Sequence, residues 1–272
     1  MKLKSNWWWD LSTKDFSDLD MSKVVAVLPT AAVEQHGPHL PVRVDSAINA
    51  GIMERVAQRI PDDLHALILP MQAVGKSVEH LEFPGTLTHS YETLARIWFE
   101  IGESVARTGC RKLVFANWHG GQPQVMEIVC RELRVKLGMF AVSANASADL
   151  DVSDLFDGQE MKHGIHGGEF ETSLLLELHP ELVDMNLAED FEPLSVEMEK
   201  AGGILTPEGR IGYGWQTQDL HPSGACGNAA AADAQRGRIA LDRAADRFVA
   251  LLKEVRDFPI ERVTQKTMYN DA

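Results

Sequence analysis

The sequence has few cysteines, no long apolar run and no leader-like segment, and each shortage excludes a class of protein. Three widely spaced cysteines (Cys110, Cys130 and Cys226) in 272 residues form neither a disulfide framework nor a thiolate zinc site, so we expect buried, small apolar side chains. No apolar stretch approaches the roughly 20 residues of a membrane-spanning helix, and Met1–Asp20 lacks the apolar region of a signal peptide. We therefore expect a cytoplasmic protein without a membrane partner.

Basic side chains are also scarce relative to acidic ones. The chain has 26 Lys and Arg against 40 Asp and Glu, a formal charge of -14, and no basic run. This excess of acidic residues argues against electrostatic binding to nucleic acid or to an anionic membrane. With 44% hydrophobic residues, the chain can bury a sizeable core. Because composition does not break and no repeat or linker is visible, we predict one domain over residues 1–272.

Short apolar runs alternate with helical patterns along the chain. Near-continuous apolar runs are typical of strands buried on both faces, and they occur at residues 23–28, 66–70, 112–116 and 139–143. Helical periodicity occurs at residues 46–60, 90–108, 122–137, 170–178 and 230–255. The alternation predicts a three-layer α/β/α domain with a mostly parallel central sheet. Two segments, 149–165 and 192–223, are predicted as long loop or insertion segments, and long loops in such domains often line a site.

The first chemically distinctive segment, VEQHGPHLPVRVD at residues 33–45, follows the first predicted strand. Glu34 and His36 stand two apart, so an extended backbone projects them to one side. Asp45 arrives just before a predicted helix. Carboxylate and imidazole are ligands that zinc, manganese or iron accepts. Asp45 could instead cap the helix, and Glu34 could be a solvated loop residue.

The second segment, NWHGGQ at residues 117–122, follows the third predicted strand and opens a helix. Ligands collect outside the carboxyl ends of strands in open α/β sheets, so His119 is predicted to share a crevice with the first segment. The glycine pair permits close backbone approach. A turn with an incidental histidine is the alternative.

The third segment, HGIHGGEFETS at residues 163–173, holds two histidines and two carboxylates within nine residues and leads into an apolar helix. Acidic residues at a helix start ordinarily compensate the helix dipole, which is the simpler interpretation of Glu169 and Glu171. Together the three segments offer a set of ligands suited to two divalent ions that share one carboxylate: Glu34, His36, Asp45, His119 and Glu169.

These motifs resemble those of the creatininase family of metal-dependent amidohydrolases. The family pattern TEQHGPHLP followed by Asp, NGHGGN and HAGE-x-ETS reads here VEQHGPHLPVRVD, NWHGGQ and HGGEFETS. The stretch GKSVEHLEFPGT at residues 75–86 and the Pro-Ser-Gly at 222–224 also match. The resemblance runs from the first strand to the last helix.

The resemblance implies roles for individual residues. Glu34, Asp45 and His119 would hold one metal; His36, Asp45 and Glu169 would hold the other. His166 matches a histidine that shuttles protons in the family, and Gly120 and Gly121 would border the reaction centre. His80 and Glu79 could line the site or could be structural.

Departures from the family pattern bear on the substrate. Creatininase proper has a Tyr-Glu pair where this chain has Gly120 and Gly121, so the second-metal carboxylate would come from Glu169. It also has a tryptophan where this chain has Lys162, which disfavours creatinine as substrate. Trp118 replaces a glycine and is predicted to abut the pocket. Arg43 could bind a substrate anion or form a salt bridge.

The resemblance implies a hydrolase that cleaves a C–N bond of a small amide, cyclic amide or formamide with two divalent ions (zinc, manganese or iron), His166 serving as proton shuttle. Alternatives are a formamide hydrolase acting on flavin-type pyrimidine intermediates, a peptidase of the family, a metal-dependent isomerase or lyase on a hydroxy-carbonyl compound, or a noncatalytic binding protein. The expected partner is a small molecule, and the family implies a homo-oligomer, often a hexamer.

The cluster Trp7-Trp8-Trp9 is predicted to pack on the domain or a neighbouring subunit, and residues 265–272 are predicted to form a surface tail.

Overall fold

Four parallel strands form the centre of the fold in the order β2-β1-β3-β4. The computed structural model describes residues 3–146, 150–209 and 211–270. The strand bounds are β1 (Val25–Thr30), β2 (Ala66–Ile68), β3 (Lys112–Asn117) and β4 (Phe140–Asn145). Every residue of β1 and β3 is buried. The four strands predicted from apolar runs are therefore confirmed, with ends shifted by a few residues.

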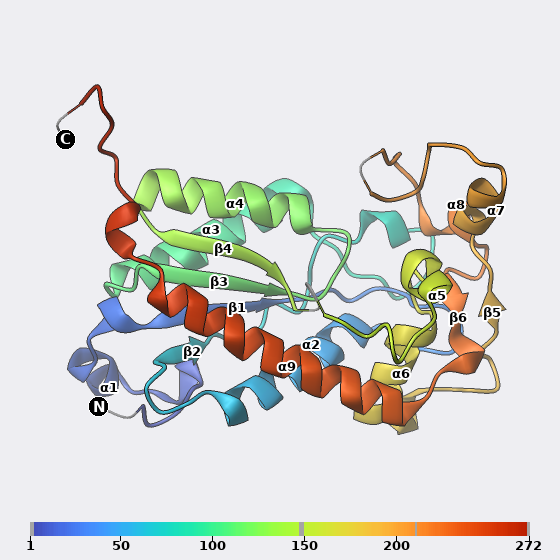
Figure 1. Ribbon diagram of the computed structural model, residues 1–272, viewed down its shortest axis with the longest axis horizontal. Coiled ribbons are helices and arrows are strands. Elements are labelled where there is room, and N and C mark those ends of the chain that lie inside the picture. Colours follow the sequence, from blue (N-terminus) through green and yellow to red (C-terminus); the bar gives the residue numbers. More distant parts are fainter. Residues whose placement is uncertain (1–2, 147–149, 210, 271–272) are drawn as a thin grey trace.

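Helices cover both faces of this sheet (Figure 1). One face carries α2 (Val44–Arg59), α6 (Glu169–Leu178) and α9 (Ala234–Asp257). The other carries α3 (Tyr91–Arg107) and α4 (Pro123–Leu137). Because alternate strand residues point to opposite faces, β1 contributes to two separate cores, Val25 and Val27 to the first and Ala26 and Leu28 to the second. This arrangement is the predicted three-layer α/β/α fold.

The crossing of α6 and α9 is close because α9 carries Gly237 there. A Cβ at Gly237 would overlap the Ser173 carbonyl oxygen of α6, so only glycine permits this approach. The contact fixes α6 against the sheet-covering helix α9. The start of α6 is thereby brought toward the carboxyl ends of the strands.

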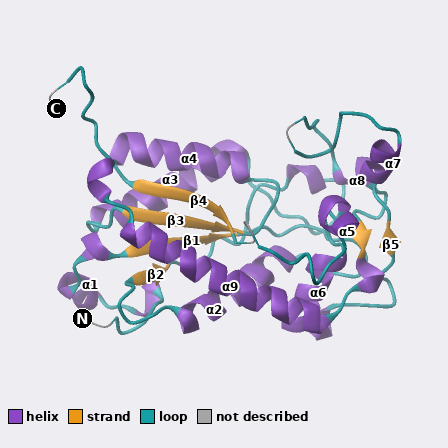
Figure 2. Ribbon diagram, in the orientation of Figure 1, coloured by secondary structure: helices purple, strands orange, loops and turns teal. Residues whose placement is uncertain are grey.

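Short elements gather beyond the strand ends, where the strand arrows of Figure 1 point. They are α5 (Gly158–His163), α7 (Leu194–Lys200), α8 (Thr217–Leu220), β5 (Asp190–Phe191) and β6 (Gly227–Asn228), and Figure 2 shows them separated by long loops. The described parts of 149–165 and 192–223, predicted as long loop or insertion segments, thus contain the short helices α5, α7 and α8 between loops. Helices of seven residues or fewer are too short for a clear apolar period, and capping starts α5 through the Asp157 side chain.

The N-terminal segment packs on the domain. It contains α1 (Thr13–Asp18), and further single turns of 3-10 helix occur at 8–10, 21–23, 78–80, 180–182, 229–231 and 260–262. Trp7 pairs with Ile68 of β2 and Trp8 packs on Phe16, while Trp9 is exposed. Two of the three tryptophans are therefore aromatic anchors, as predicted.

The cysteines and the termini agree with the predictions where they are described. All three cysteines are free and buried, and burial raises the pKa of the Cys130 and Cys226 thiols to about 12. In the described ranges no helix has the length and apolar content to cross a membrane. Residues 265–270 are exposed, and residues 271–272 of the predicted tail lie outside the described part.

Candidate metal centre

Neighbouring strand ends bring the first and second motifs together. Thr30, the last residue of β1, lies beside Asn117, the last residue of β3. Glu34 and His36 follow β1, and His119 follows β3. Each of these three side chains is buried. The crevice predicted at the carboxyl ends of the strands is therefore present.

Asp45 lies inside the first turn of α2 and not before it. The N-cap of α2 is Arg43, whose side chain makes no capping hydrogen bond, and Asp45 is buried. The capping role considered for Asp45 is therefore excluded. Its carboxylate instead faces the crevice, with Oδ1 3.5 Å from His36 Nε2 and Oδ2 3.3 Å from His119 Nδ1.

Asp45 belongs to two groups of potential metal ligands at once. One group is Glu34, Asp45 and His119, and the other is His36, Asp45 and Glu171; within each group the ligand atoms lie within 4.8 Å of one another. Glu34 Oε1 is 3.2 Å from His119 Nδ1. A carboxylate shared by two sets of ligands is the arrangement of a two-ion centre.

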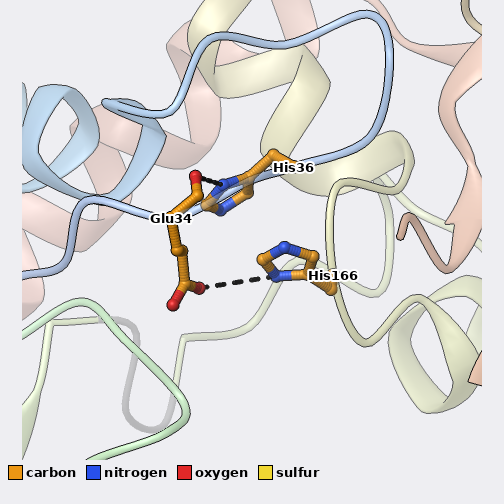
Figure 3. Close-up of side chains that lie close together, drawn as sticks. All are labelled: Glu34, His36 and His166. Carbon is orange, nitrogen blue, oxygen red and sulfur yellow. Dashed lines mark hydrogen bonds and ion pairs between the residues drawn. The ribbon is translucent and has the colours of Figure 1, made fainter. Parts of the chain in front are cut away.

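Backbone carbonyls fix the imidazole tautomers of His36 and His119. Nδ1 of His36 donates to the Glu34 carbonyl oxygen at 3.0 Å, a contact visible in Figure 3. Nε2 of His119 donates to the Lys76 carbonyl oxygen at 2.7 Å. Since a carbonyl only accepts, the opposite nitrogens, His36 Nε2 and His119 Nδ1, face the carboxylates, and each would offer its lone pair to an ion after losing its proton.

The buried atoms at this centre fit divalent ions. Three side-chain atoms here have no hydrogen-bond partner, namely Glu34 Oε2, His36 Nε2 and Asp45 Oδ2. Leaving a buried polar atom unpaired costs about 1–3 kcal/mol, and more for a charged group. A set of carboxylates and imidazoles suits zinc, manganese or iron. The donors present therefore match the ions that the sequence predicts.

His166 comes from the third motif and lies against the same cluster. Its ring centroid is 4.0 Å from that of His36 and 4.4 Å from that of His80, and Nδ1 is 3.7 Å from Glu34 Oε1 (Figure 3). Nε2 donates to the Gln35 carbonyl oxygen. Burial, together with the charges of His36 and His80, holds the pKa of His166 well below its usual range. His166 is thus a neutral imidazole with a free Nδ1.

Glu171 reaches the cluster, whereas Glu169 does not. The Glu171 carboxylate lies 3.8 Å from His36 Nε2 and accepts the Gly167 N–H at 2.7 Å. The Glu169 carboxylate forms an ion pair with Arg236 of α9. At 3.6 residues per turn, residues two apart on a helix point about 200° away from each other, so only one of them can face the crevice.

The remaining charges at the cluster shift one another's pKa values. Burial raises the pKa of Glu34, but the charge of His119 outweighs that effect and holds the pKa well below its usual range. Burial lowers the pKa of His36, but the nearby carboxylates of Asp45, Glu171 and Glu34 raise it to about 9. Burial raises the pKa of Glu171 to about 7 although His36 opposes this. The ion-free cluster therefore holds protons that metal binding would displace.

A buried carboxylate holds the third motif in place. Glu160 Oε1 accepts the Glu169 N–H at 2.7 Å, and Oε2 accepts the Asn228 N–H of β6 at 2.9 Å. Glu160 therefore caps α6, whose own N-cap Gly168 has no capping side chain. A Cβ on Gly164 or Gly168 would overlap Oε1 of Glu160. The glycines of this motif thus make room for Glu160.

A cavity of about 190 Å³ opens beside the cluster. Its lining is Asn117, Trp118, His119, Gly120, Asn145, Gly164, Ile165, Phe170 and Glu171. Trp118 is 7% exposed, and its ring lies 6.0 Å from that of Phe170. The indole of Trp118 and the backbone of Gly120 thus both lie at this cavity.

Other residues of the motifs lie near the cluster without lining this cavity. A Cβ on Gly121 would overlap Glu79 Oε1, so the second glycine is required for packing beside His119. His80 Nε2 is 3.5 Å from Glu34 Oε1, and its Nδ1 contacts Thr217 Oγ1 at 2.9 Å. Lys162 forms an exposed ion pair with Glu199. Gln122, which was not predicted as an anchor, is fully buried, and its side-chain amide forms hydrogen bonds with three separate segments.

Comparison with known proteins identifies similar enzymes. The family model described as "Creatininase: Creatinine amidohydrolase" matches residues 9–252. A "Mycofactocin precursor peptide peptidase" of Mycobacterium ulcerans is 33% identical over 75% of this chain and 80% of that protein, and a "Creatinine amidohydrolase" of Pseudomonas putida is 34% identical over 62% and 70%. The solved structure "Creatininase Mn" is 26% identical with a TM-score of 0.74, covering 93% of this chain and 100% of that one.

Proposed function

The chain belongs to the creatininase family of hydrolases, and we propose that it hydrolyses a C–N bond of a small amide, cyclic amide or formamide with two divalent ions. The observation that carries this proposal is Asp45, whose carboxylate is shared by two groups of buried ligands beside a small cavity. Unpartnered atoms on Glu34, His36 and Asp45 support the same conclusion.

In this proposal Glu34, Asp45 and His119 hold one ion, and His36, Asp45 and Glu171 hold the other. Solved creatininases described as "Mn" and as of the "Zn-Zn type" support manganese or zinc, and iron has the same ligand preferences. When bound, a pair of such ions lowers the pKa of a water and polarises a carbonyl oxygen. Glu171 takes the place that the sequence assigned to Glu169.

His166 moves the proton in this scheme. Its Nε2–H is held by the Gln35 carbonyl oxygen, so Nδ1 alone can accept a proton. Its lowered pKa keeps it neutral at physiological pH, as a general base requires. The proton on Nδ1 is then available for the leaving nitrogen. Glu34 Oε1, 3.7 Å away, stabilises the charged imidazolium.

The dimensions of the cavity favour a small substrate. Its volume of about 190 Å³ lies below the roughly 300–1,000 Å³ of pockets for drug-sized ligands. Trp118 and Phe170 flank it, which suits a flat group. Asn145 lines both this cavity and a second groove.

A peptide bond is the second candidate, and that groove favours it. The groove has a volume of about 350 Å³ and runs along β4 between α4 and α9. β4 lies at the edge of the sheet, where an extended peptide can add as a strand. Relatives named as peptidases fit this candidate.

The test is a product-release assay on formamides, lactams, cyclic ureas and short peptides. The protein is stripped with a chelator and reloaded with zinc, manganese or iron in turn. We expect no turnover without metal and one amine released for each carboxylate formed with it. Full activity of the metal-free protein would refute the mechanism, and an isomeric product without amine would indicate an isomerase.

A further inference from the structure

We propose that Asn145 binds substrate, donating its amide N–H to a second, neutral carbonyl oxygen that is not part of the bond cleaved. The inference rests on the proposed function because it places substrate in the cavity beside the metal centre. Asn145 is the last residue of β4 and lies level with Asn117 of β3. It lines both the cavity and the groove along β4, so a ligand of either kind must pass it.

The orientation of the Asn145 amide is set by hydrogen bonds that begin at backbone groups. Gln122 Oε1 accepts the Lys76 N–H at 3.2 Å, and Gln122 Nε2 donates to the Ala31 carbonyl oxygen at 3.3 Å. Because an N–H only donates and a carbonyl only accepts, the Gln122 amide has one orientation. Its Nε2 also donates to Asn117 Oδ1 at 2.8 Å.

The orientation of the Asn117 amide in turn fixes that of the Asn145 amide. Its Nδ2 donates to the His119 carbonyl oxygen at 2.7 Å and to Asn145 Oδ1 at 2.9 Å. Both hydrogens of this NH2 group are then used, and Asn145 must present oxygen to it. The Nδ2 group of Asn145 therefore points away from Asn117. It has no partner within residues 3–146, 150–209 and 211–270, and Asn145 is exposed.

The charge of the cavity indicates the kind of group that Asn145 would bind. The described residues that line it include no Lys or Arg, the side chains that bind carboxylates and phosphates most strongly. A neutral N–H donor beside an acidic cluster suits a neutral acceptor. The substrate class is therefore a compound with two carbonyls, such as a cyclic imide or a peptide, in preference to an anion.

The experiment compares two ring compounds that differ by one carbonyl, succinimide and 2-pyrrolidinone, by equilibrium binding to the metal-loaded protein. We expect the wild-type protein to bind succinimide more tightly. In Asn145→Ala this preference should fall by roughly 3–10-fold, the value of a neutral hydrogen bond, while 2-pyrrolidinone binding stays unchanged. N-acetylglycinamide supplies the second carbonyl from a peptide, and tighter binding of it than of succinimide would assign the peptide source.

A matched control is Ser143→Ala, also exposed on β4 but lining only the groove; the succinimide preference should survive in it. Equal weakening of both ring compounds in Asn145→Ala, or no preference in the wild-type protein, would overturn the assignment. Binding does not require turnover, so the two proposals can fail separately. If Asn145→Ala loses the preference for succinimide but the wild-type protein hydrolyses none of the compounds, the result supports the role of Asn145 and rejects only the proposed function.

Discussion

Two regions meet at the metal centre, and they differ in what holds their side chains in place. The strand-end region, which supplies Glu34, His36, Asp45 and His119, follows β1 and β3 and includes the start of α2. The loop region, residues 164–171, supplies His166 and Glu171 and has no strand of the four-stranded sheet. The first is fixed by the register of the sheet, and the second by a few specific contacts.

Those contacts make the loop region depend on single residues. His166 is joined to Cys226 by two backbone hydrogen bonds, and Glu160 joins the start of α6 to β6. The imidazoles of both regions are oriented by backbone carbonyls, which no side-chain substitution removes, but the loop region depends in addition on the Glu160 side chain. The strand-end region should therefore tolerate changes around its ligands better than the loop region does.

The largest effect is expected from Asp45→Asn, because Asp45 belongs to both groups of ligands. Both ions should be lost, and kcat/KM should fall by more than about 100-fold, beyond the range for residues that only support ligands. Metal content of the purified protein and turnover measure this. Retention of one full equivalent of metal would show that Asp45 is not shared.

Paired variants at Glu171 and Glu169 separate the two roles within the loop region. Glu171→Gln should lose one of the two ions and most of the activity, while the ion held by the strand-end region stays. Glu169→Gln removes the ion pair between Arg236 and Glu169, so it should lower the melting temperature and keep both ions. Elemental analysis and thermal unfolding distinguish them, and the reverse pattern would restore Glu169 as a ligand.

Glu160→Gln tests the side chain that holds the loop region. The amide would direct an NH2 group at a backbone N–H of Glu169 or Asn228, so α6 should shift and kcat should fall about 10–100-fold. Glu197, an acidic residue of α7 on the same side of the molecule, provides the matched control as Glu197→Gln. A folded Glu160→Gln protein with unchanged kcat would contradict this role.

The pH dependence of metal binding sharpens the comparison, because the pKa values of the imidazoles in the two regions are shifted in opposite directions. Burial lowers the pKa of His36, but Asp45 and nearby carboxylates raise it to about 9, whereas the pKa of His166 is lowered. To bind metal His36 must lose a proton, and so must His119, for which burial lowers the pKa but Glu34 and Asp45 hold it well above its usual range. Between pH 7 and 9 affinity should therefore rise with pH, by up to about tenfold per unit for each proton released. Calorimetry in buffers of different ionisation enthalpy counts the protons. Affinity that falls as pH rises would contradict it.

The smallest effect is expected from Trp118→Phe at the edge of the cavity. Trp118 also packs in the core beside α2 and α6, so removing the ring altogether would create a void costing about 3–5 kcal/mol. Phenylalanine keeps most of that packing and changes the surface offered to substrate, and KM should change a few-fold with kcat nearly constant. Steady-state kinetics on two substrates of different width measure this; identical selectivity would remove Trp118 from substrate binding.

Much of the strand-end region could be predicted from the sequence. Apolar runs are local signals, and they predicted the four strands. Because the polar motifs follow parallel strands, they must lie together at the carboxyl edge of the sheet. The choice between Glu169 and Glu171 could not be predicted this way. Both begin a helix, and which one faces the crevice depends on how α6 packs and on Arg236, 67 residues further along the chain.

The sequence by itself determined the alternation of strands and helices and the motifs that collect carboxylates and imidazoles at one edge of the sheet. Only the tertiary structure decided that Glu171 and not Glu169 faces the crevice, that Glu160 caps α6, and that Asn145 presents its N–H group. The physical reason is the separation of interacting residues along the sequence. Hydrophobic periodicity depends on neighbouring residues, whereas hydrogen-bond partners such as Glu160 and Asn228 are 68 residues apart and meet only when the chain has folded.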